Sequence, residues 1–552
     1  MVGLATVFGA GGGTSSYAEA EAADVIIMWG SNARNAHPIF FQRVLRAVNA
    51  GAKLFVIDPR RSETATFADR WLGLRVGTDI ALANTIAREI IHSDLAHSDF
   101  IERATSGFDS FAAAVEDWTL ERGSEVTGVP IDAIRELAHA YASAKAAQLC
   151  WTLGITEHHN GVDNVLALCN LSLLTGQVGR YGAGLSPLRG QNNVQGGGDM
   201  GALPNKLPGF QDVADAQLRA KFNEAWEAEV PSEVGWHLTQ MFDAMERREL
   251  SSVLVIGENP ARSEADVSRA VDLLNGLDHL VVLDIFLTKT AALADVVLPG
   301  SASWCESDGT VTNSERRVQR VRKAIDPPGD ARDDIAILLD LARRLGHNWD
   351  YTDHEQIWEE LRTLSPMHAG MSWERIEELN GIQWPCFSDD SLEPPFLHGR
   401  LWADNPHDRG RPAPFSIVTD SPPAEATSGQ YPLRLTTGRR LDSYNTGVQS
   451  GGYRSPNRIG ETIDISPEDA ATLAVSDGEL VRISSPRGSV DAPIRIDPSL
   501  REGLVFMTFH FADEVDVNQL TIDATDPLAG TAEFKAAAVR IEKLDADSRQ
   551  WS

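Results

Sequence analysis

The strongest constraint on the fold is an internal repeat of strand, loop, helix and strand. In the first copy, the mostly apolar run 24–29 predicts a buried strand, Gly30-Ser31-Asn32 a loop, residues 40–48 a helix, and residues 53–57 a strand ending at Asp58. Short continuous apolar runs are typical of parallel strands that are covered on both faces. The order therefore predicts a β–loop–α–β unit.

The same order returns later in the chain. Residues 252–256 predict a strand, 257–260 a loop, 267–274 a helix, and 279–283 a strand that ends at another aspartate. The loop asparagine and this aspartate are 26 residues apart in the first copy and 25 in the second, and an Ala-Asp pair ends 11 residues further on in both. We call residues 24–69 the first repeat and residues 252–295 the second repeat.

Units of this kind have a familiar chemistry. Glycine lets the backbone turn sharply and approach a ligand, and helix N-termini favour phosphate oxygens. A carboxylate at the end of the next strand can accept hydrogen bonds from ribose hydroxyls or a guanine edge. The pair of repeats predicts two nucleotide moieties, or one ligand with two nucleotide ends. A single NAD site fits less well because neither strand is followed by GxGxxG. The similar run 9–14 lacks a preceding strand, which favours a structural loop.

Size, charge and cysteine content narrow the class of protein. With 552 residues, two to four domains are expected. No run approaches the roughly 20 apolar residues of a membrane span, and the N-terminus lacks the basic start of a signal peptide, so we expect a cytoplasmic protein without a membrane span. The net charge of −30 argues against nonspecific nucleic-acid binding. The four cysteines form no CxxC pair, so we expect no iron–sulfur or zinc site within the chain, and buried, reduced thiols instead.

The C-terminal part of the chain changes character. Residues 350–428 are rich in Trp, Pro, Asp and His without periodicity, which predicts an irregular connection over the surface. Short β-type runs at 433–437, 480–484 and 490–496 then predict a small β-barrel, with a helix beginning after Ser466. Together these patterns predict four domains: 1–190, 191–350, 351–428 and 429–552.

A loop between the two repeats points to a family. Residues 187–201 combine one arginine, several amides and many glycines, a composition that suits close approach to a polar ligand better than a flexible linker. The run 188–204 resembles the signature of formate dehydrogenases of the bis-molybdopterin guanine dinucleotide (MGD) class. Segments 151–161, 294–299 and 306–319 resemble the same family, and the resemblance covers nearly the whole chain.

The resemblance implies a fold and a set of cofactor-binding residues. The fold is α/β: two related Rossmann-like units with parallel sheets, followed by a C-terminal β-barrel of the double-psi type. Two MGD groups hold one molybdenum or tungsten ion, each with its nucleotide on one α/β unit. The residues implied for the first nucleotide are Gly30, Asn32, His37, Asp58, Arg60, Gly77, Thr78 and Asp79. Those implied for the second nucleotide and for the pterins are Gly154, Gly190, Gly257, Asn259, Asp284, Thr288, Asp295, Thr437, Gly438, Arg439, Asn518 and Lys535.

The substrate residue follows from chemistry as well as from the resemblance. A guanidinium group binds a carboxylate through two parallel charge-assisted hydrogen bonds, so Arg189 is the expected formate ligand. A phosphate-binding role for Arg189 is the alternative. Gln191, or a nearby backbone N–H group, is expected to help orient the substrate.

The resemblance also places the metal ligand before residue 1. Relatives carry a cysteine or selenocysteine ligand, a histidine and a [4Fe–4S] cysteine cluster there, so we expect a truncated chain without a metal ligand of its own. Three explanations stay open: a separate upstream polypeptide or lost reading frame, a selenocysteine codon read as a stop, or a natural remnant. The functional hypotheses are a formate dehydrogenase catalytic subunit with electron-transfer partners, a non-catalytic pterin-binding chain or assembly partner, and another oxidoreductase of the superfamily.

Overall fold

The computed structural model describes residues 1–303, 305–390, 392–441, 443–447 and 459–544, which fall into two compact units. The first unit consists of Met1–Leu188, Arg262–Ser268 and Phe396–Ser552, and the second consists of Arg189–Ala261 and Arg269–Pro395. The four-domain division remains a prediction. Among the described residues, no helix is both long enough and apolar enough to cross a membrane.

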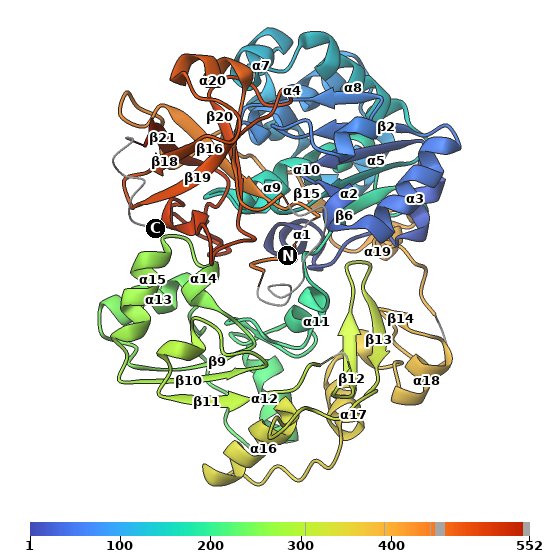
Figure 1. Ribbon diagram of the computed structural model, residues 1–552. Helices are drawn as coiled ribbons and strands as arrows, with labels where there is room; N and C mark the ends of the chain where they lie inside the picture. The colour runs from blue at the N-terminus through green and yellow to red at the C-terminus, as the bar shows by residue number, and fades with distance from the viewer. Residues whose placement is uncertain (304, 391, 442, 448–458, 545–552) are drawn as a thin grey trace. The chain divides into compact units, whose positions relative to one another are not determined.

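A parallel sheet forms the centre of the first unit (Figure 1). Its strand order is β3-β2-β1-β5-β6, and each neighbouring pair is parallel. The strands are β1 (Val25–Trp29), β2 (Lys53–Ile57), β3 (Arg70–Leu72), β5 (Ala147–Trp151) and β6 (Gly184–Pro187). This confirms the first repeat as an α/β unit.

Successive side chains of β1 point to opposite faces of this sheet, and both faces are apolar. Ile27 and Trp29 of β1 pack into one buried cluster, whereas Ile26 and Met28 pack into another on the opposite face. The first cluster includes residues of α4 (Asp79–His92), α8 (Ile131–Ser143) and α10 (Gly161–Thr175), and the second includes residues of α3 (Pro38–Asn49). A strand covered by helices on both faces needs a continuous apolar run, which is the pattern seen in the sequence.

Shorter elements complete the α/β part of the first unit. They are α1 (Val2–Phe8), α2 (Ala33–Ala36), α5 (Ser98–Ala104), β4 (Thr105–Ser106), α6 (Phe108–Val115), α7 (Leu120–Thr127), α9 (Leu153–Thr156), α19 (Pro406–Arg409) and β15 (Ala413–Pro414). The glycine-rich run after α1 is a structural loop, as expected: Gly9 ends the helix in the left-handed region, and the Thr14 N–H donates to the Leu185 carbonyl.

The C-terminal part of the first unit is a closed barrel, as predicted. In the described residues its strand order is β16-β20-β17-β19-β18-β21. The strands are β16 (Leu433–Gly438), β17 (Ile463–Ile465), β18 (Leu480–Ser484), β19 (Ser489–Ile496), β20 (Leu504–Thr508) and β21 (Ala537–Lys543). Helix α20 (Pro467–Leu473) begins after Ser466, whose side chain accepts a hydrogen bond from the Asp469 N–H and so caps the helix.

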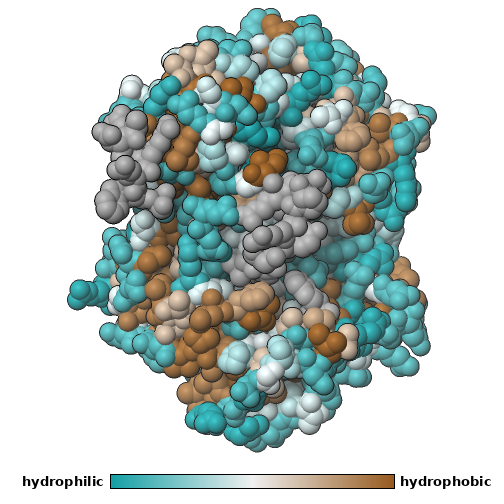
Figure 2. All heavy atoms as spheres, viewed as in Figure 1, coloured by the Kyte–Doolittle hydropathy of each residue, from teal (hydrophilic) through white to brown (hydrophobic). Residues whose placement is uncertain are grey.

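The second unit contains the strands of the second repeat as a smaller parallel sheet. Its order is β11-β10-β9, formed by β9 (Ser252–Ile256), β10 (His279–Asp284) and β11 (Val296–Pro299). Helices α13 (Leu238–Glu246) and α15 (Val267–Asn275) supply residues to the buried cluster on one face. On the other side, Leu254 and Ile256 of β9 are exposed, and Figure 2 shows apolar surface gathered over this sheet.

The rest of the second unit consists of helices and short strands. It includes α11 (Val194–Asp199), β7 (Lys206–Leu207), β8 (Gln211–Asp212), α12 (Ala216–Trp226), β12 (Gly309–Thr312), β13 (Arg317–Val321), α16 (Asp334–Arg344), α17 (His354–Leu364), α18 (Trp373–Glu378) and β14 (Ile382–Gln383). Helices α17 and α18 lie in the stretch expected to be irregular. They are fixed by buried aromatic side chains such as Trp358, whose indole N–H donates to the Met371 carbonyl.

The four cysteines form no disulfide bond among the described residues, and three of them are buried. Burial raises the pKa of the Cys150 and Cys169 thiols to about 12, so both are protonated and unreactive at neutral pH. The described residues contain no cluster of three or more His, Cys, Asp or Glu side chains that could hold a metal ion.

Candidate cofactor site

Two glycines bring the ends of β1 and β5 into direct contact. Gly30 follows β1 with φ +57°, and a Cβ added there would lie 2.8 Å from the carbonyl carbon of Gly154. The Gly154 N–H donates to the Gly30 carbonyl oxygen at 3.2 Å, and the Thr152 hydroxyl donates to the same oxygen at 2.7 Å. A side chain at either glycine would separate the two loops, so the residue type is dictated by the close approach of the backbones.

Asn32 holds the loop of the first repeat in place. Its Oδ1 accepts hydrogen bonds from the backbone N–H of Thr64 at 3.2 Å and from the Thr64 hydroxyl at 3.0 Å. Asn32 is also the residue before α2, where the chain turns away from the sheet. The side chain therefore fixes the shape of the loop, and it lines the pocket described below.

Asp58 and Arg60 lie side by side at the end of β2. The Asp58 Oδ1 accepts a hydrogen bond from the Arg60 backbone N–H at 2.9 Å, and the Arg60 guanidinium lies over the Phe506 ring, 3.5 Å from its centroid. Burial raises the pKa of the Asp58 carboxyl and lowers the pKa of Arg60, while their mutual attraction opposes both shifts. A buried acceptor beside a half-buried cation is suited to a ligand that carries both N–H donors and phosphate groups.

The start of α4 adds a second buried carboxylate. Gly77 has φ +79°, and Thr78 precedes the first helical residue, Asp79. The Asp79 Oδ1 accepts a hydrogen bond from the indole N–H of Trp29 at 2.7 Å, and burial raises the pKa of this carboxyl. Trp29 is the last residue of β1, so the strand and the helix together position Asp79.

The barrel supplies further cations. Lys535 forms a 2.6 Å ion pair with Glu157, and its ammonium group donates to the Thr437 hydroxyl at 3.4 Å. Burial lowers the pKa of Lys535 and of Arg439. At Gly438 an added Cβ would lie 2.9 Å from the Phe506 ring, which keeps β16 and β20 close together. The segments next to β16 and β21 thus place basic side chains beside the loops of the first repeat, within the same unit.

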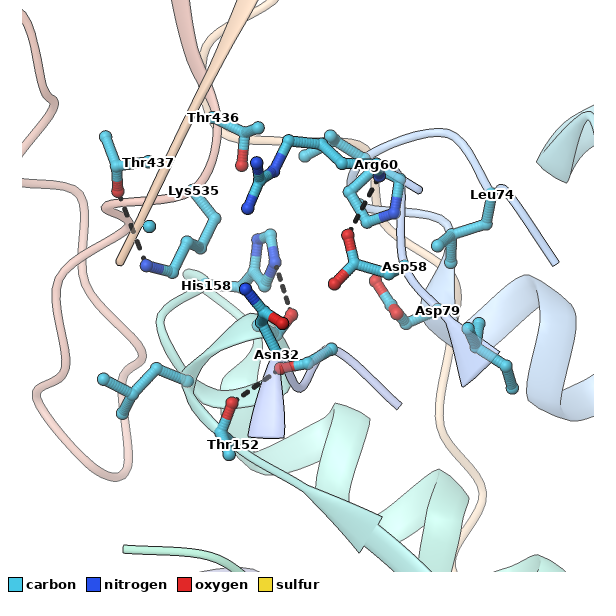
Figure 3. Close-up of a pocket in the computed structure, with 18 of the residues that line it drawn as sticks. Asn32, Asp58, Arg60, Leu74, Asp79, Thr152, His158, Thr436, Thr437 and Lys535 are labelled. Atoms are coloured by element: carbon cyan, nitrogen blue, oxygen red, sulfur yellow. Dashed lines mark hydrogen bonds between the residues drawn. The ribbon is translucent and has the colours of Figure 1, made fainter. Parts of the chain in front are cut away.

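These groups line a single pocket in the first unit (Figure 3). Its lining includes the predicted residues Gly30, Asn32, Asp58, Arg60, Gly77, Asp79, Gly154, Thr437, Gly438, Arg439 and Lys535. The basic groups of Arg60, Arg439 and Lys535 line it together with the carboxylates of Asp58 and Asp79. Thr152 and His158 lie alongside. A dinucleotide fits this chemistry because its phosphates need cations and its guanine and ribose groups need acceptors.

Sequence reasoning missed some of the residues that line this pocket. Thr152, His158 and Thr436 line it but were not proposed as ligands. His158 is buried, and its Nδ1 lies 3.3 Å from an oxygen of Glu533. The signal was present, because His158 belongs to the segment 151–161 that carried part of the family resemblance.

Three of the predicted residues in the first unit lie outside the lining. Thr78 directs its hydroxyl to the Arg75 carbonyl at 2.7 Å. His37 stands between α2 and α3, and its backbone N–H donates to the Ala33 carbonyl. The Asn518 amide donates to the Arg262 carbonyl at 3.1 Å.

The second repeat reproduces the hydrogen bonds of the first. The Asn259 Oδ1 accepts hydrogen bonds from the Thr290 N–H at 3.1 Å and the Thr290 hydroxyl at 2.8 Å. Asp284 accepts a hydrogen bond from the backbone N–H two residues later, and Asp295 accepts one from the Leu280 N–H at 2.7 Å. Gly257 has φ +62°, close to the value at Gly30. Thr288 is buried and accepts a hydrogen bond from the Ala291 N–H.

The Arg189 loop is fixed at both ends within the second unit. The Arg189 backbone N–H donates to the Ser314 hydroxyl at 2.8 Å, and the Asn193 Oδ1 accepts from the Thr312 N–H at 2.9 Å. Two segments that carried the family resemblance, 188–204 and 306–319, therefore pack against each other. Arg189 is half-buried, whereas Gly190 and Gln191 are exposed.

Family models match most of the chain. Residues 7–344 match the molybdopterin oxidoreductase family, and residues 433–538 match the Molydopterin dinucleotide binding domain. The chain is 42% identical over 549 residues to the F420-dependent formate dehydrogenase 2 subunit alpha of Methanococcus maripaludis, covering 99% of this chain and 80% of the relative. It is 34% identical over 555 residues to formate dehydrogenase H of Escherichia coli, covering 100% of this chain and 77% of the relative.

A solved structure supports the same fold. Acetylene hydratase from Pelobacter acetylenicus superposes with a TM-score of 0.74 at 22% identity, over 98% of this chain and 80% of that one. At this identity the likeness concerns the arrangement of the chain rather than its chemistry. The α/β fold with parallel sheets and a C-terminal barrel is thus confirmed.

Proposed function

The chain belongs to the molybdopterin oxidoreductase family, and from this premise we propose that it is the catalytic subunit of a formate dehydrogenase. The family supplies a molybdopterin dinucleotide cofactor with molybdenum or tungsten. The observation that carries the choice of formate is the Arg189 loop, which presents a guanidinium group on a backbone held by Ser314 and Thr312. Two of the relatives described above are named as formate dehydrogenases.

We assign one nucleotide of the cofactor to each repeat. In the first, Asp58 and Asp79 would accept hydrogen bonds from the guanine or ribose groups, and Arg60 would neutralise phosphate charge. In the second repeat, Asp284 occupies the position of Asp58, and Asn259 that of Asn32. The shared hydrogen bonds support two equivalent nucleotides rather than one.

Arg189 would bind the substrate. Burial lowers the pKa of its guanidinium to about 10, which leaves it charged at neutral pH. A charged fork can hold both oxygens of formate and so direct the C–H bond of the substrate. Gln191 is exposed in the same loop, and we assign it an auxiliary role in orienting the substrate.

The reaction converts formate into carbon dioxide, one proton and two electrons. When bound, the metal–pterin group supplies the redox chemistry that no side chain here can perform, by accepting the two electrons. Arg189 holds the carboxylate while the C–H bond breaks, and it releases the product because carbon dioxide carries no charge to pair with the guanidinium. The electrons then pass to a partner subunit, in keeping with the name subunit alpha in the relative from Methanococcus maripaludis.

The test combines metal analysis with formate-dependent dye reduction. We expect the purified protein to hold molybdenum or tungsten and to reduce the dye, and Arg189→Ala to lower kcat/KM for formate by about 100-fold or more, since two charge-assisted hydrogen bonds are lost. Arg189→Lys keeps the positive charge but cannot form the two parallel hydrogen bonds. Its kcat/KM for formate should therefore lie between those of the wild type and Arg189→Ala.

Two results would contradict this proposal in different ways. Bound metal and pterin without any formate turnover would favour a non-catalytic pterin-binding chain. Full formate activity in Arg189→Ala would favour another substrate for this member of the family.

A further inference from the structure

The guanidinium group of Arg189 is held by a buried amide. The Gln195 Oε1 accepts hydrogen bonds from the Arg189 Nη2 at 3.0 Å and from the Arg189 Nε at 3.3 Å. Gln195 lies on α11 and is 1% exposed. A single oxygen that accepts from two nitrogens of one guanidinium fixes the plane of that group.

The other end of the Gln195 amide is fixed in turn. Its Nε2 donates to the Asp199 Oδ1 at 2.8 Å, one helical turn further along α11. The second carboxylate oxygen, Asp199 Oδ2, accepts a hydrogen bond from the indole N–H of Trp384 at 2.7 Å. Asp199 is 1% exposed, so water cannot replace either donor at low cost.

The donor and acceptor types give this chain of hydrogen bonds one direction. Guanidinium and indole groups can only donate, whereas an ionised carboxylate can only accept. Gln195 stands between Arg189 and Asp199 and must accept from one while donating to the other. Only one orientation of its amide satisfies both neighbours, and Asp199 enforces that orientation because its ionised carboxylate can only accept a hydrogen bond from the Gln195 Nε2.

We propose that Asp199 and Gln195 are positioning residues for substrate binding, which hold the Arg189 guanidinium in the orientation that receives the carboxylate of formate. This inference rests on the proposed function, because it gives Arg189 the role of substrate ligand. Neither Asp199 nor Gln195 needs to touch formate. Their effect reaches the substrate through the Gln195 amide.

The charge state of Asp199 offers an independent readout. Burial raises its pKa to about 7, against the hydrogen bonds from Gln195 and Trp384 and the charges of Arg189 and Arg316. A protonated Asp199 would carry an O–H between two groups that both donate, which disturbs the chain of hydrogen bonds. The KM for formate should therefore rise as pH falls below about 7.

The decisive variant is Asp199→Asn in the holoenzyme. Asparagine offers one acceptor where two donors point, so either Trp384 or Gln195 must turn away. We expect the KM for formate to rise about tenfold, with a smaller change in kcat, and its dependence on pH near 7 to disappear. The dissociation constant of nitrate, a planar oxyanion that the oxidised enzyme cannot reduce, should rise in parallel, as a measurement that does not depend on turnover.

A second substitution distinguishes positioning from a general loss of structure. Trp384→Phe removes the competing donor, so in Asp199→Asn/Trp384→Phe the asparagine oxygen can again accept from Gln195. We expect the double variant to recover most of the lost formate affinity, although two buried groups have now been changed. Trp384→Phe alone should leave KM within about twofold. The matched control is Asp333→Asn, which alters a structural carboxylate of the same unit.

The possible outcomes separate the two proposals. A KM for formate that is unchanged in Asp199→Asn, or that the double variant fails to restore, overturns the positioning role. If Arg189→Ala also leaves formate kinetics unchanged, the proposed function fails with it. If Arg189→Ala abolishes formate affinity while Asp199→Asn behaves like the wild type, the positioning role alone is wrong.

Discussion

The first and second repeats have the same hydrogen bonds in very different surroundings. In both, the loop asparagine accepts two hydrogen bonds from a threonine, and the loop glycine N–H donates to the last part of the neighbouring strand at 2.8 Å. Yet β1 is buried on both faces, whereas β9 exposes Leu254 and Ile256. The geometry of the nucleotide loop is therefore set locally, by a few polar residues, and not by how deeply the sheet is buried.

The repeats differ in what lies next to the loop. At the end of β1, Gly154 and the barrel residues close over the loop, and Arg60 stands two residues after the aspartate. In the second repeat, the position of Arg60 is taken by Phe286, which is exposed. The two loops thus share the same hydrogen bonds but differ in the residues that pack against them. Matched substitutions in the two repeats can therefore distinguish the contribution of the shared hydrogen bonds from that of the surrounding residues.

The two repeats should differ most in the loss of stability caused by substituting the loop glycine. Both have a positive φ, so alanine at either position costs about 1–2 kcal/mol in backbone strain. At Gly257 an added Cβ meets no atom of the described residues within 4 Å, whereas at Gly30 it would lie 2.8 Å from the backbone of Gly154. That overlap should add about 1–3 kcal/mol to the cost of Gly30→Ala.

Chemical denaturation of the two variants tests this difference. We expect Gly30→Ala to lower the free energy of unfolding by clearly more than Gly257→Ala, and also to reduce the amount of bound cofactor. Equal losses would mean that the contact with Gly154 does not constrain the loop.

Substitution of the loop asparagine should cost a similar free energy of unfolding in both repeats. Asn32→Ala and Asn259→Ala each remove two hydrogen bonds to a threonine, and each should cost about 2 kcal/mol in the free energy of unfolding. Asn32→Asp and Asn259→Asp keep the accepting oxygen and serve as controls with smaller losses. If the losses of the two alanine variants differ by more than about 1 kcal/mol, the surrounding residues rather than the shared hydrogen bonds determine the contribution of the asparagine to the free energy of unfolding.

Sequence reasoning found the repeats because their signals are local. An apolar run, a Gly–Asn loop and a terminal aspartate lie within 35 residues of one another in each copy. The sheet order could not be found in the same way, since β5 pairs with β1 from more than 100 residues away. Thr152 follows β5, which explains why its place in the pocket was missed.

Long-range side-chain contacts were also beyond prediction. Lys535 was proposed only because of the family resemblance, as nothing near it in sequence indicates that it faces Glu157. The hydrogen bond between Trp384 and Asp199 joins residues 185 positions apart. Such contacts depend on how whole elements pack, and no local pattern of residue types encodes them.

The smallest expected effect concerns the aspartates at the strand ends. Here the substitution of a buried aspartate should stabilise the cofactor-free protein rather than destabilise it. Burial raises the pKa of Asp58 above its ordinary value of 3.8. Its contribution to stability is therefore complete below pH 3.8 and is lost as pH rises through the raised pKa. Asp58→Asn removes this loss and keeps an oxygen for the Arg60 N–H, so the cofactor-free variant should be slightly more stable than the wild type at pH 7.

The second repeat provides the control, because Asp284 is less buried than Asp58. We expect the pH dependence of unfolding between pH 4 and 7 to flatten in Asp58→Asn, measured by denaturation at each pH, with Asp284→Asn as the matched substitution in the second repeat. Both variants should nevertheless retain less cofactor, since each loses a charged acceptor for the nucleotide. A cofactor-free Asp58→Asn protein that is less stable than the wild type at pH 7 would contradict this reasoning, because the carboxylate would then stabilise the fold rather than serve the ligand at the expense of stability.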